Sequence, residues 1–176
     1  MRAWRMLWKD WGFAESLFTQ AKHFLASARQ SASGSAQEGL IRASIVFSLM
    51  SFEAYFFEVV NGYIQQKGAT LDPTGRMKVQ DGLVKHTGIH EALRDWPKFL
   101  TGNSLDTTTK AYADFVNFTK YRNALLHGKI TENIPSWGKL AQDVETIDGA
   151  ELAQRTVSEM VKAVARHFGF PIRTWV

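Results

Sequence analysis

Apolar residues recur at intervals of three and four along most of the chain, the spacing that gathers them on one face of an α-helix. The pattern is clearest over residues 13–25, 40–64, 112–127 and 152–168, and polar or small residues separate these segments. Single apolar residues never alternate with polar ones for long enough to indicate a strand. The pattern therefore predicts an all-α protein, an antiparallel helical bundle of four to five main helices with short additional helices.

Capping and turn residues predict where these helices begin and end. Two pairs of side chains have the spacing of a capping box, Ser35 with Glu38 and Asp148 with Glu151. Asp72 followed by Pro73 predicts the cap and the first residue of a short helix. Asp106 is expected to cap the helix over residues 112–127. The helix that precedes Asp106 is expected to end before Pro97, because proline removes a helical hydrogen bond.

The most apolar segment, residues 40–64, predicts a helix buried at the centre of the bundle. A transmembrane helix is the competing interpretation. Glu53 and Glu58 lie inside the only window long enough to cross a bilayer, and each would cost about 3 kcal/mol at its centre. Three serines make the window more polar still. We therefore expect no transmembrane segment.

A polar cluster lies at the end of the helix predicted over residues 112–127. The sequence there is YADFVNFTKYRNALLHG, with Arg122, Asn123 and His127 close together and Gly128 well suited to follow a helix end. At about 100° per residue, Asn123 and His127 share nearly one face, while Arg122 must reach sideways by about 140°. The three side chains can then converge on one anion. The same residues also fit an ordinary helix end, in which histidine and glycine only terminate the helix.

The segment RNALLHG resembles the arginine-polar-x-x-x-histidine motif of the HEPN superfamily, the higher eukaryotes and prokaryotes nucleotide-binding domains. The earlier aromatic-rich segment SIVFSLMSFEAYFFEVVNGYI is similar to the acid-bearing helix that HEPN bundles often place ahead of the motif. The resemblance implies one HEPN-like domain over residues 1–176 and a metal-independent endoribonuclease, as in toxins and antiviral-defence effectors. It assigns Arg122, Asn123 and His127 to the catalytic site.

Each of these three residues has a chemical role under that resemblance. His127 would act as general base on a ribose 2′-hydroxyl or as general acid for the leaving oxygen, because its pKa lies near working pH. Arg122 would bind the scissile phosphate and stabilise the charge that develops on it. Asn123 would orient the imidazole or the phosphate. Because one chain supplies one motif histidine, we expect an isologous homodimer that brings two motifs together.

Three further residues are expected to assist the motif. Lys129 and Lys120 are candidate RNA phosphate contacts, although Lys129 can equally stabilise the negative end of the helix. Glu53 can pair with Arg122 and orient it as a supporting residue. The alternative for Glu53 is an exposed or interface position, which is the more common place for a helical glutamate.

The sequence lacks the usual signatures of metal and cofactor sites. Cysteine is absent, which excludes a disulfide framework and a thiolate zinc site. His86 and His90 are one helical turn apart, but Gly88 lies between them and no third ligand is evident, so we expect ordinary surface histidines. No phosphate-binding glycine loop or dinucleotide motif occurs. We therefore expect neither a metal nor a cofactor.

Composition and charge are compatible with this interpretation. The chain has 176 residues, 45% of them hydrophobic, and a net charge of +4, which permits a polyanionic partner such as RNA. Residues 1–12 form a Trp-rich extension that we expect to pack on the bundle or on a dimer partner. A membrane-surface helix and a platform for RNA bases are its alternatives. The absence of cysteine and of a signal peptide favours a cytoplasmic location.

A second functional interpretation is a non-catalytic helical interaction module or a nucleotide-binding regulatory module. Arg122 and His127 would then be structural, or would bind a nucleotide without cleaving it. The first interpretation adds an antitoxin or regulatory protein as a further partner. The two differ in whether Arg122 and His127 face an open cleft shared between subunits or are occupied by internal partners such as Glu53.

Overall fold

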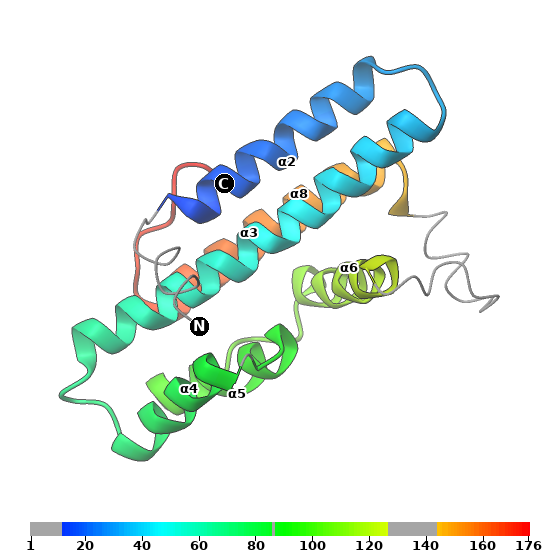
Figure 1. Ribbon diagram of the computed structural model, residues 1–176. Coiled ribbons are helices and arrows are strands. Elements are labelled where there is room, and N and C mark those ends of the chain that lie inside the picture. The colour runs from blue at the N-terminus through cyan, green and yellow to red at the C-terminus, as the bar shows by residue number, and fades with distance from the viewer. Residues whose placement is uncertain (1–11, 86, 127–143) are drawn as a thin grey trace.

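The computed structural model describes residues 12–85, 87–126 and 144–176, most of which are helical (Figure 1). The helices are α2 (Phe13–Gln30), α3 (Ser35–Lys67), α4 (Pro73–Lys85), α5 (Ile89–Thr101), α6 (Lys110–Leu126) and α8 (Ile147–Phe168). No strand occurs among the described residues. The helices pack together, and the prediction of an all-α helical bundle is confirmed.

Helix α3 is the centre of the bundle. It contacts α2, α6 and α8, and its largest aromatic side chains are buried among them. Phe52 meets Phe115 of α6 with 4.7 Å between ring centroids, and Phe56 stacks on Trp96 of α5 at 6.0 Å. Figure 1 shows α2 on one side of α3 and α4 to α6 on the other. The expected buried central helix is therefore present, and it extends beyond the predicted range at both ends.

Helices α3 and α8 run in the same direction, whereas α2 runs opposite to both (Figure 1). At one end Arg42 of α3 bonds Glu145, which lies just before α8, over 2.6 Å. At the other end the rings of Tyr63 and Phe168 are 5.2 Å apart. The parallel pair arises because α4, α5 and α6 carry the chain back between α3 and α8.

The serines that dilute the apolar character of α3 are buried without losing hydrogen bonds. Ser44, Ser48 and Ser51 are each 0% exposed. The Ser44 hydroxyl donates to the carbonyl of Ala21 in α2 over 2.9 Å, and the other two donate to carbonyls one turn earlier in α3. These bonds offset the cost of burying a polar group. The small serine side chains also allow α2 and α3 to approach closely.

Helix α3 is also long and apolar enough to cross a membrane, judged by length and composition alone. In the described structure 67% of its most apolar 18-residue window is buried among the other helices. A buried core helix passes the same test of length and composition. The expectation that the chain has no transmembrane segment stays a prediction.

Both predicted capping boxes are wrong, and other residues start the two helices. The residue before α3 is Gly34, whose φ of 140° lies in a region that favours glycine, and no side chain caps the helix. Glu38 instead lies 3.6 Å from Arg42, one turn further along. Helix α8 is capped by Thr146, whose hydroxyl accepts a hydrogen bond from the backbone of Gly149 over 2.9 Å.

The start of α4 agrees with the sequence prediction, but the end of α5 does not. The carboxylate of Asp72 accepts a hydrogen bond from the backbone N–H of Gly75 over 2.6 Å, and α4 begins at Pro73. Helix α5 continues through Pro97 to Thr101. Trp96 and Leu100, on either side of the proline, are only 3% and 5% exposed, and their burial compensates for the lost hydrogen bond.

Helix α6 begins at Lys110, two residues before the predicted range but later than a cap at Asp106 would place its first residue. The carboxylate of Asp106 accepts hydrogen bonds from the backbone and hydroxyl of Thr108 at 2.9 and 2.7 Å, which forms a local turn before the helix. The hydroxyl of Thr109 accepts from the backbone N–H of Tyr112 at 3.2 Å. Thr109 therefore takes the capping role predicted for Asp106.

Substitution of Gly75 tests the close packing of α4 on α5. A Cβ atom at this position would collide with the backbone carbonyl oxygen of Phe99. We expect Gly75→Ala to lower the free energy of unfolding by about 1–3 kcal/mol, measured by urea denaturation. Gly39→Ala on α3 is the matched control, because no described atom other than its chain neighbours and the adjoining backbone of α3 lies within 4 Å of its Cβ position. Gly39→Ala should raise the free energy of unfolding by about 0.5–1 kcal/mol. Equal effects of the two substitutions would contradict the close packing of α4 on α5.

Buried Glu58 should make stability depend on pH. Burial raises its pKa, although the backbone N–H of Ala14 and the guanidinium of Arg173 act in the opposite direction. Between its unfolded and folded pKa values the native state binds more protons, so stability falls as pH rises through that window. We expect Glu58→Gln to increase the free energy of unfolding at neutral pH. The gain should vanish below about pH 4, where the glutamate is protonated in both states; an equal gain at both pH values would contradict this cause.

Candidate functional site

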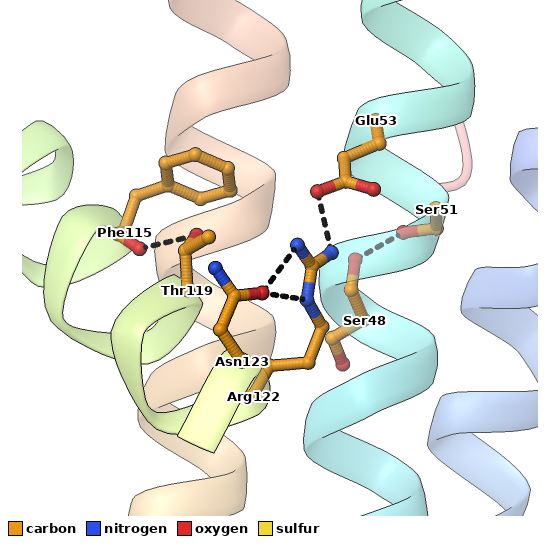
Figure 2. A network of polar contacts seen from close by, with 7 residues as sticks. All are labelled: Ser48, Ser51, Glu53, Phe115, Thr119, Arg122 and Asn123. Atoms are coloured by element: carbon orange, nitrogen blue, oxygen red, sulfur yellow. Dashed lines mark hydrogen bonds and ion pairs between the residues drawn. The ribbon is translucent and has the colours of Figure 1, made fainter. Parts of the chain in front are cut away.

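Arg122 lies near the end of α6 with its guanidinium turned toward α3 (Figure 2). Its Nη1 donates to Oε1 of Glu53, an ion pair in which the two side chains are only 12% and 24% exposed. Its Nε and Nη2 donate to the amide oxygen of Asn123 at 3.3 and 3.1 Å. The guanidinium is therefore oriented by a carboxylate on one side and an amide on the other.

Aromatic packing sets the register that brings Glu53 and Arg122 together. Phe115 lies seven residues before Arg122 and therefore on nearly the same face of α6. Its ring packs edge-on against Phe52, which immediately precedes Glu53 on α3. Between Phe115 and Arg122, the buried hydroxyl of Thr119 donates to the Phe115 carbonyl over 2.9 Å (Figure 2). The buried rings thus align the two helices, and the ion pair forms one residue beyond the ring contact on α3.

A second polar cluster fixes the end of α6 from its other side. The Tyr121 hydroxyl donates to Glu145 over 2.8 Å, and Arg42 of α3 donates to the same carboxylate over 2.6 Å. Burial and the carboxylate of Glu145 raise the pKa of Tyr121, so its hydroxyl stays protonated as the donor. This cluster joins α3 and α6 to the residues that precede α8. The sequence does not predict this cluster, because no spacing rule relates residues so far apart in the chain.

His90 does not lie on the open surface, contrary to the sequence prediction. It is half-buried on α5, and its imidazole packs edge-on against Phe115 of α6, with 6.1 Å between the ring centroids. Burial, then the positive charges of Arg122 and Lys120, lower the pKa of His90. The sequence does not predict this contact, because no spacing rule relates a residue of α5 to one of α6. In the described part of the chain, no group of three or more histidine, aspartate and glutamate side chains could hold a metal ion.

The structure brings together some of the residues predicted for the site. Arg122, Asn123 and Glu53 are in contact, and Lys120 is exposed on α6. Two predicted site residues, His127 and Lys129, lie outside the described residues, as do the tryptophans of the N-terminal extension. Leu126, one of the apolar residues in the helix predicted over residues 112–127, is 66% exposed at the end of α6.

A separate cleft of about 460 Å³ opens where α4 begins beside α5. Lys78, Lys98 and Phe99 are among the residues that line it, and the Lys78 ammonium lies 5.0 Å from the centre of the Phe99 ring. Asp72 also lines the cleft, and its carboxylate accepts a hydrogen bond from the backbone N–H of Gly75. None of the residues predicted for the site lines this cleft, so it is not part of the arrangement around Arg122.

The chemistry available at Arg122 follows from its donors. A guanidinium has five N–H groups, and the contacts with Glu53 and Asn123 use three of them. One N–H on each terminal nitrogen has no partner among the described residues. An anion can meet these two groups, but it shares the guanidinium with the negative charge of Glu53. The arrangement orients Arg122 well and at the same time weakens its attraction for an anion.

Comparisons of the chain with models of protein families, with curated proteins and with solved structures find no match. The function of the site must therefore be inferred from its residues and their geometry.

Removal of the Glu53 carboxylate tests how much the partly buried ion pair stabilises the bundle. Glu53→Ala leaves the guanidinium of Arg122 without its counter-charge, and we expect a loss of about 1–3 kcal/mol in the free energy of unfolding. Glu151→Ala is the matched control, because Glu151 pairs with Arg29 where the two side chains are 37% and 52% exposed. Its loss should stay below about 1 kcal/mol. Equal losses in urea denaturation would show that the Glu53 pair is no stronger than a surface pair.

Proposed function

We propose that this protein is a metal-independent endoribonuclease of the HEPN type. The observation that carries the proposal is the oriented guanidinium of Arg122, held by Glu53 and Asn123 near the end of α6, where the RNALLHG sequence begins. An arginine that binds a transferring phosphate must be fixed before the reaction begins, because reorientation during the reaction would raise the barrier. Glu53 then serves as the supporting residue.

The proposed reaction is a transesterification within the RNA. The ribose 2′-oxygen loses its proton to a base and attacks the adjacent phosphorus, and the bond from phosphorus to the 5′-oxygen breaks as that oxygen accepts a proton. His127 acts as the base or the acid, Arg122 stabilises the negative charge on the phosphoryl oxygens, and Asn123 orients one of them. The nucleophile belongs to the RNA, so the scheme uses no metal or cofactor.

A homodimer completes the proposed site. Cleavage uses both a base and an acid, and a two-fold axis near the ends of the two α6 helices supplies two motif histidines. Lys129 and Lys120 then extend the contacts to neighbouring phosphates. Such an enzyme fits a toxin or antiviral-defence effector, whose activity an antitoxin or regulatory protein would restrain.

A second candidate function is a non-catalytic interaction or nucleotide-binding regulatory module. The observation that favours it is the same ion pair: Glu53 partly neutralises Arg122 within its own chain, as in a structural pair between helices. In that case Arg122 holds α6 on α3, and the bundle acts through its surface.

Cleavage of labelled single-stranded and structured RNA in excess EDTA tests the proposal. We expect cleavage by the unaltered protein and a loss of about 10²–10⁴-fold in His127→Ala, the typical contribution of a general acid or base. His23→Ala on α2 is the matched control, because His23 is exposed and belongs to a different part of the bundle. It should keep full activity.

Other results of this assay point to different conclusions. Absence of cleavage by the unaltered protein, or equal cleavage by His127→Ala, would contradict the endoribonuclease and favour the regulatory module. Cleavage that stops on chelation would contradict the metal-independent mechanism. Sedimentation of the unaltered protein tests the dimer, since a monomer with full activity would contradict a composite site.

A further inference from the structure

The cleft at the start of α4 is a second place where the chain can bind a ligand. Its volume of about 460 Å³ is within the range of small-molecule sites in proteins. Its walls come from the loop after α3, the first turns of α4 and the last turn of α5. None of these elements contributes to the proposed catalytic site, so a ligand here would add to the proposed function.

Close packing of α4 on α5 gives this cleft a fixed shape. The backbone of Gly75 lies so near α5 that a Cβ atom would be 2.4 Å from the carbonyl oxygen of Phe99. The carboxylate of Asp72 holds the first turn of α4 through the backbone N–H of Gly75, over 2.6 Å. At the end of α5, the hydroxyl of Thr101 donates to the carbonyl of Pro97 over 2.8 Å. The walls are therefore in place before a ligand binds.

Two ammonium groups line the cleft from different helices. Lys78 belongs to α4 and Lys98 to α5, and both side chains are exposed to solvent. The Lys78 ammonium lies 5.0 Å from the centre of the Phe99 ring, a contact that positions it without neutralising its charge. Neither lysine forms an ion pair with a carboxylate in the described part of the chain.

The carboxylates near these lysines already have other donors. Asp72 is the one acidic residue that lines the cleft in the described ranges, and it accepts the hydrogen bond from Gly75. Asp95 lies one turn before Lys98 and interacts with its charge, but Arg94 donates to both oxygens of Asp95, at 2.8 and 2.7 Å. Two positive charges and one negative charge thus line the cleft, and the balance favours an anion.

Apolar side chains form much of the remaining wall. Leu100 is buried, and Leu71 and Phe99 are half-buried beside the two lysines. The exposed hydroxyl of Thr74 makes no hydrogen bond to another described residue, so it can donate to an anion. A ligand that matches these walls has a strongly charged anionic end and a small apolar body.

We propose that this cleft binds a small phosphate monoester, with its phosphate between Lys78 and Lys98 and its organic group against Leu71 and Phe99. A phosphate monoester carries nearly two negative charges at neutral pH, which matches two ammonium groups. Its tetrahedral oxygens can accept hydrogen bonds from two helices at once. A carboxylate has one charge and its oxygens lie in one plane, so it matches the two lysines less well.

The test titrates phenyl phosphate into the full chain and follows the backbone amide signals by nuclear magnetic resonance. We expect the signals of the cleft residues to shift. Phenyl phosphate should bind about tenfold more tightly than inorganic phosphate, because its ring covers apolar surface. Phenyl sulfate, which has a similar shape but one charge, should bind more weakly. Affinity for phenyl phosphate should rise with pH up to about 6, where the ester loses its second proton, and then level off.

Three variants locate the binding. Lys78→Gln and Lys98→Gln should each weaken the binding of phenyl phosphate about tenfold, the effect of one charge-assisted hydrogen bond. Both side chains are exposed, so the circular dichroism of the variants should match that of the unaltered protein. Lys85→Gln is the matched control, because it removes the same charge from the last turn of α4, outside the cleft. Its affinity should be unchanged.

Several outcomes would overturn the inference. Absence of binding, signal shifts confined to other helices, or equal losses in all three variants would show that the cleft is not a site. Equal affinity for phenyl sulfate and phenyl phosphate would contradict the choice of a phosphate monoester. Much tighter binding of a 5′-phosphorylated oligonucleotide would replace the small molecule with the end of a nucleic acid. RNA cleavage does not enter these outcomes, since the cleft shares no residue with the site around Arg122.

Discussion

The burial of α3 on several sides is the constraint on which the rest of the structure depends. Apolar residues occur around most of this helix, so a single neighbour cannot cover it. Helices α2, α6 and α8 together supply the cover. Polar groups on its covered faces lose contact with water, and partners inside the bundle offset the cost of their burial. The buried serines bond to backbone carbonyls, and Glu53 pairs with Arg122. The buried hydroxyl of Tyr55 on α3 has no hydrogen-bond partner among the described residues.

Because of this constraint, Arg122 has a structural role as the partner of Glu53. A catalytic role for Arg122 must be compatible with that ion pair. Glu53 lies beside the buried Phe52, and the ring contact between Phe52 and Phe115 places Arg122 opposite the carboxylate. An arginine that is fixed in this way loses little entropy when it binds a phosphate, which favours binding. It also keeps a negative charge at its side, which opposes binding. The balance between the two effects depends on how strongly Glu53 holds the guanidinium, and the two side chains are only 24% and 12% exposed.

Features set by neighbouring residues could be predicted from the sequence, and features set by packing could not. Helical spacing predicted the central helix, and Asp72 with Pro73 correctly located the start of α4, since both depend on local backbone geometry. Proline at position 97 predicted a helix end, but burial of Trp96 outweighs one lost hydrogen bond. Thr146 caps α8 because its hydroxyl, and not a carboxylate two residues later, meets the free backbone N–H of the first turn.

The same distinction between local features and packing applies to the residues of the candidate site. The sequence located Arg122 and Asn123 at a helix end and identified Glu53 as a partner to consider, because all three belong to two long regular helices. It did not find His90 or Glu145, since their contacts cross between elements that no periodicity relates.

The contacts of His90 and Glu145 show that a short sequence motif does not include the residues that pack around it. Tyr121 and Arg122 are adjacent in sequence, yet one is held by Glu145 on the side of α8 and the other by Glu53 on α3. The end of α6 is therefore fixed on two sides by side chains from outside the motif. The packing that brings Glu53 to Arg122 also limits what the arginine can bind, because the contacts with Glu53 and Asn123 use three of its five N–H groups.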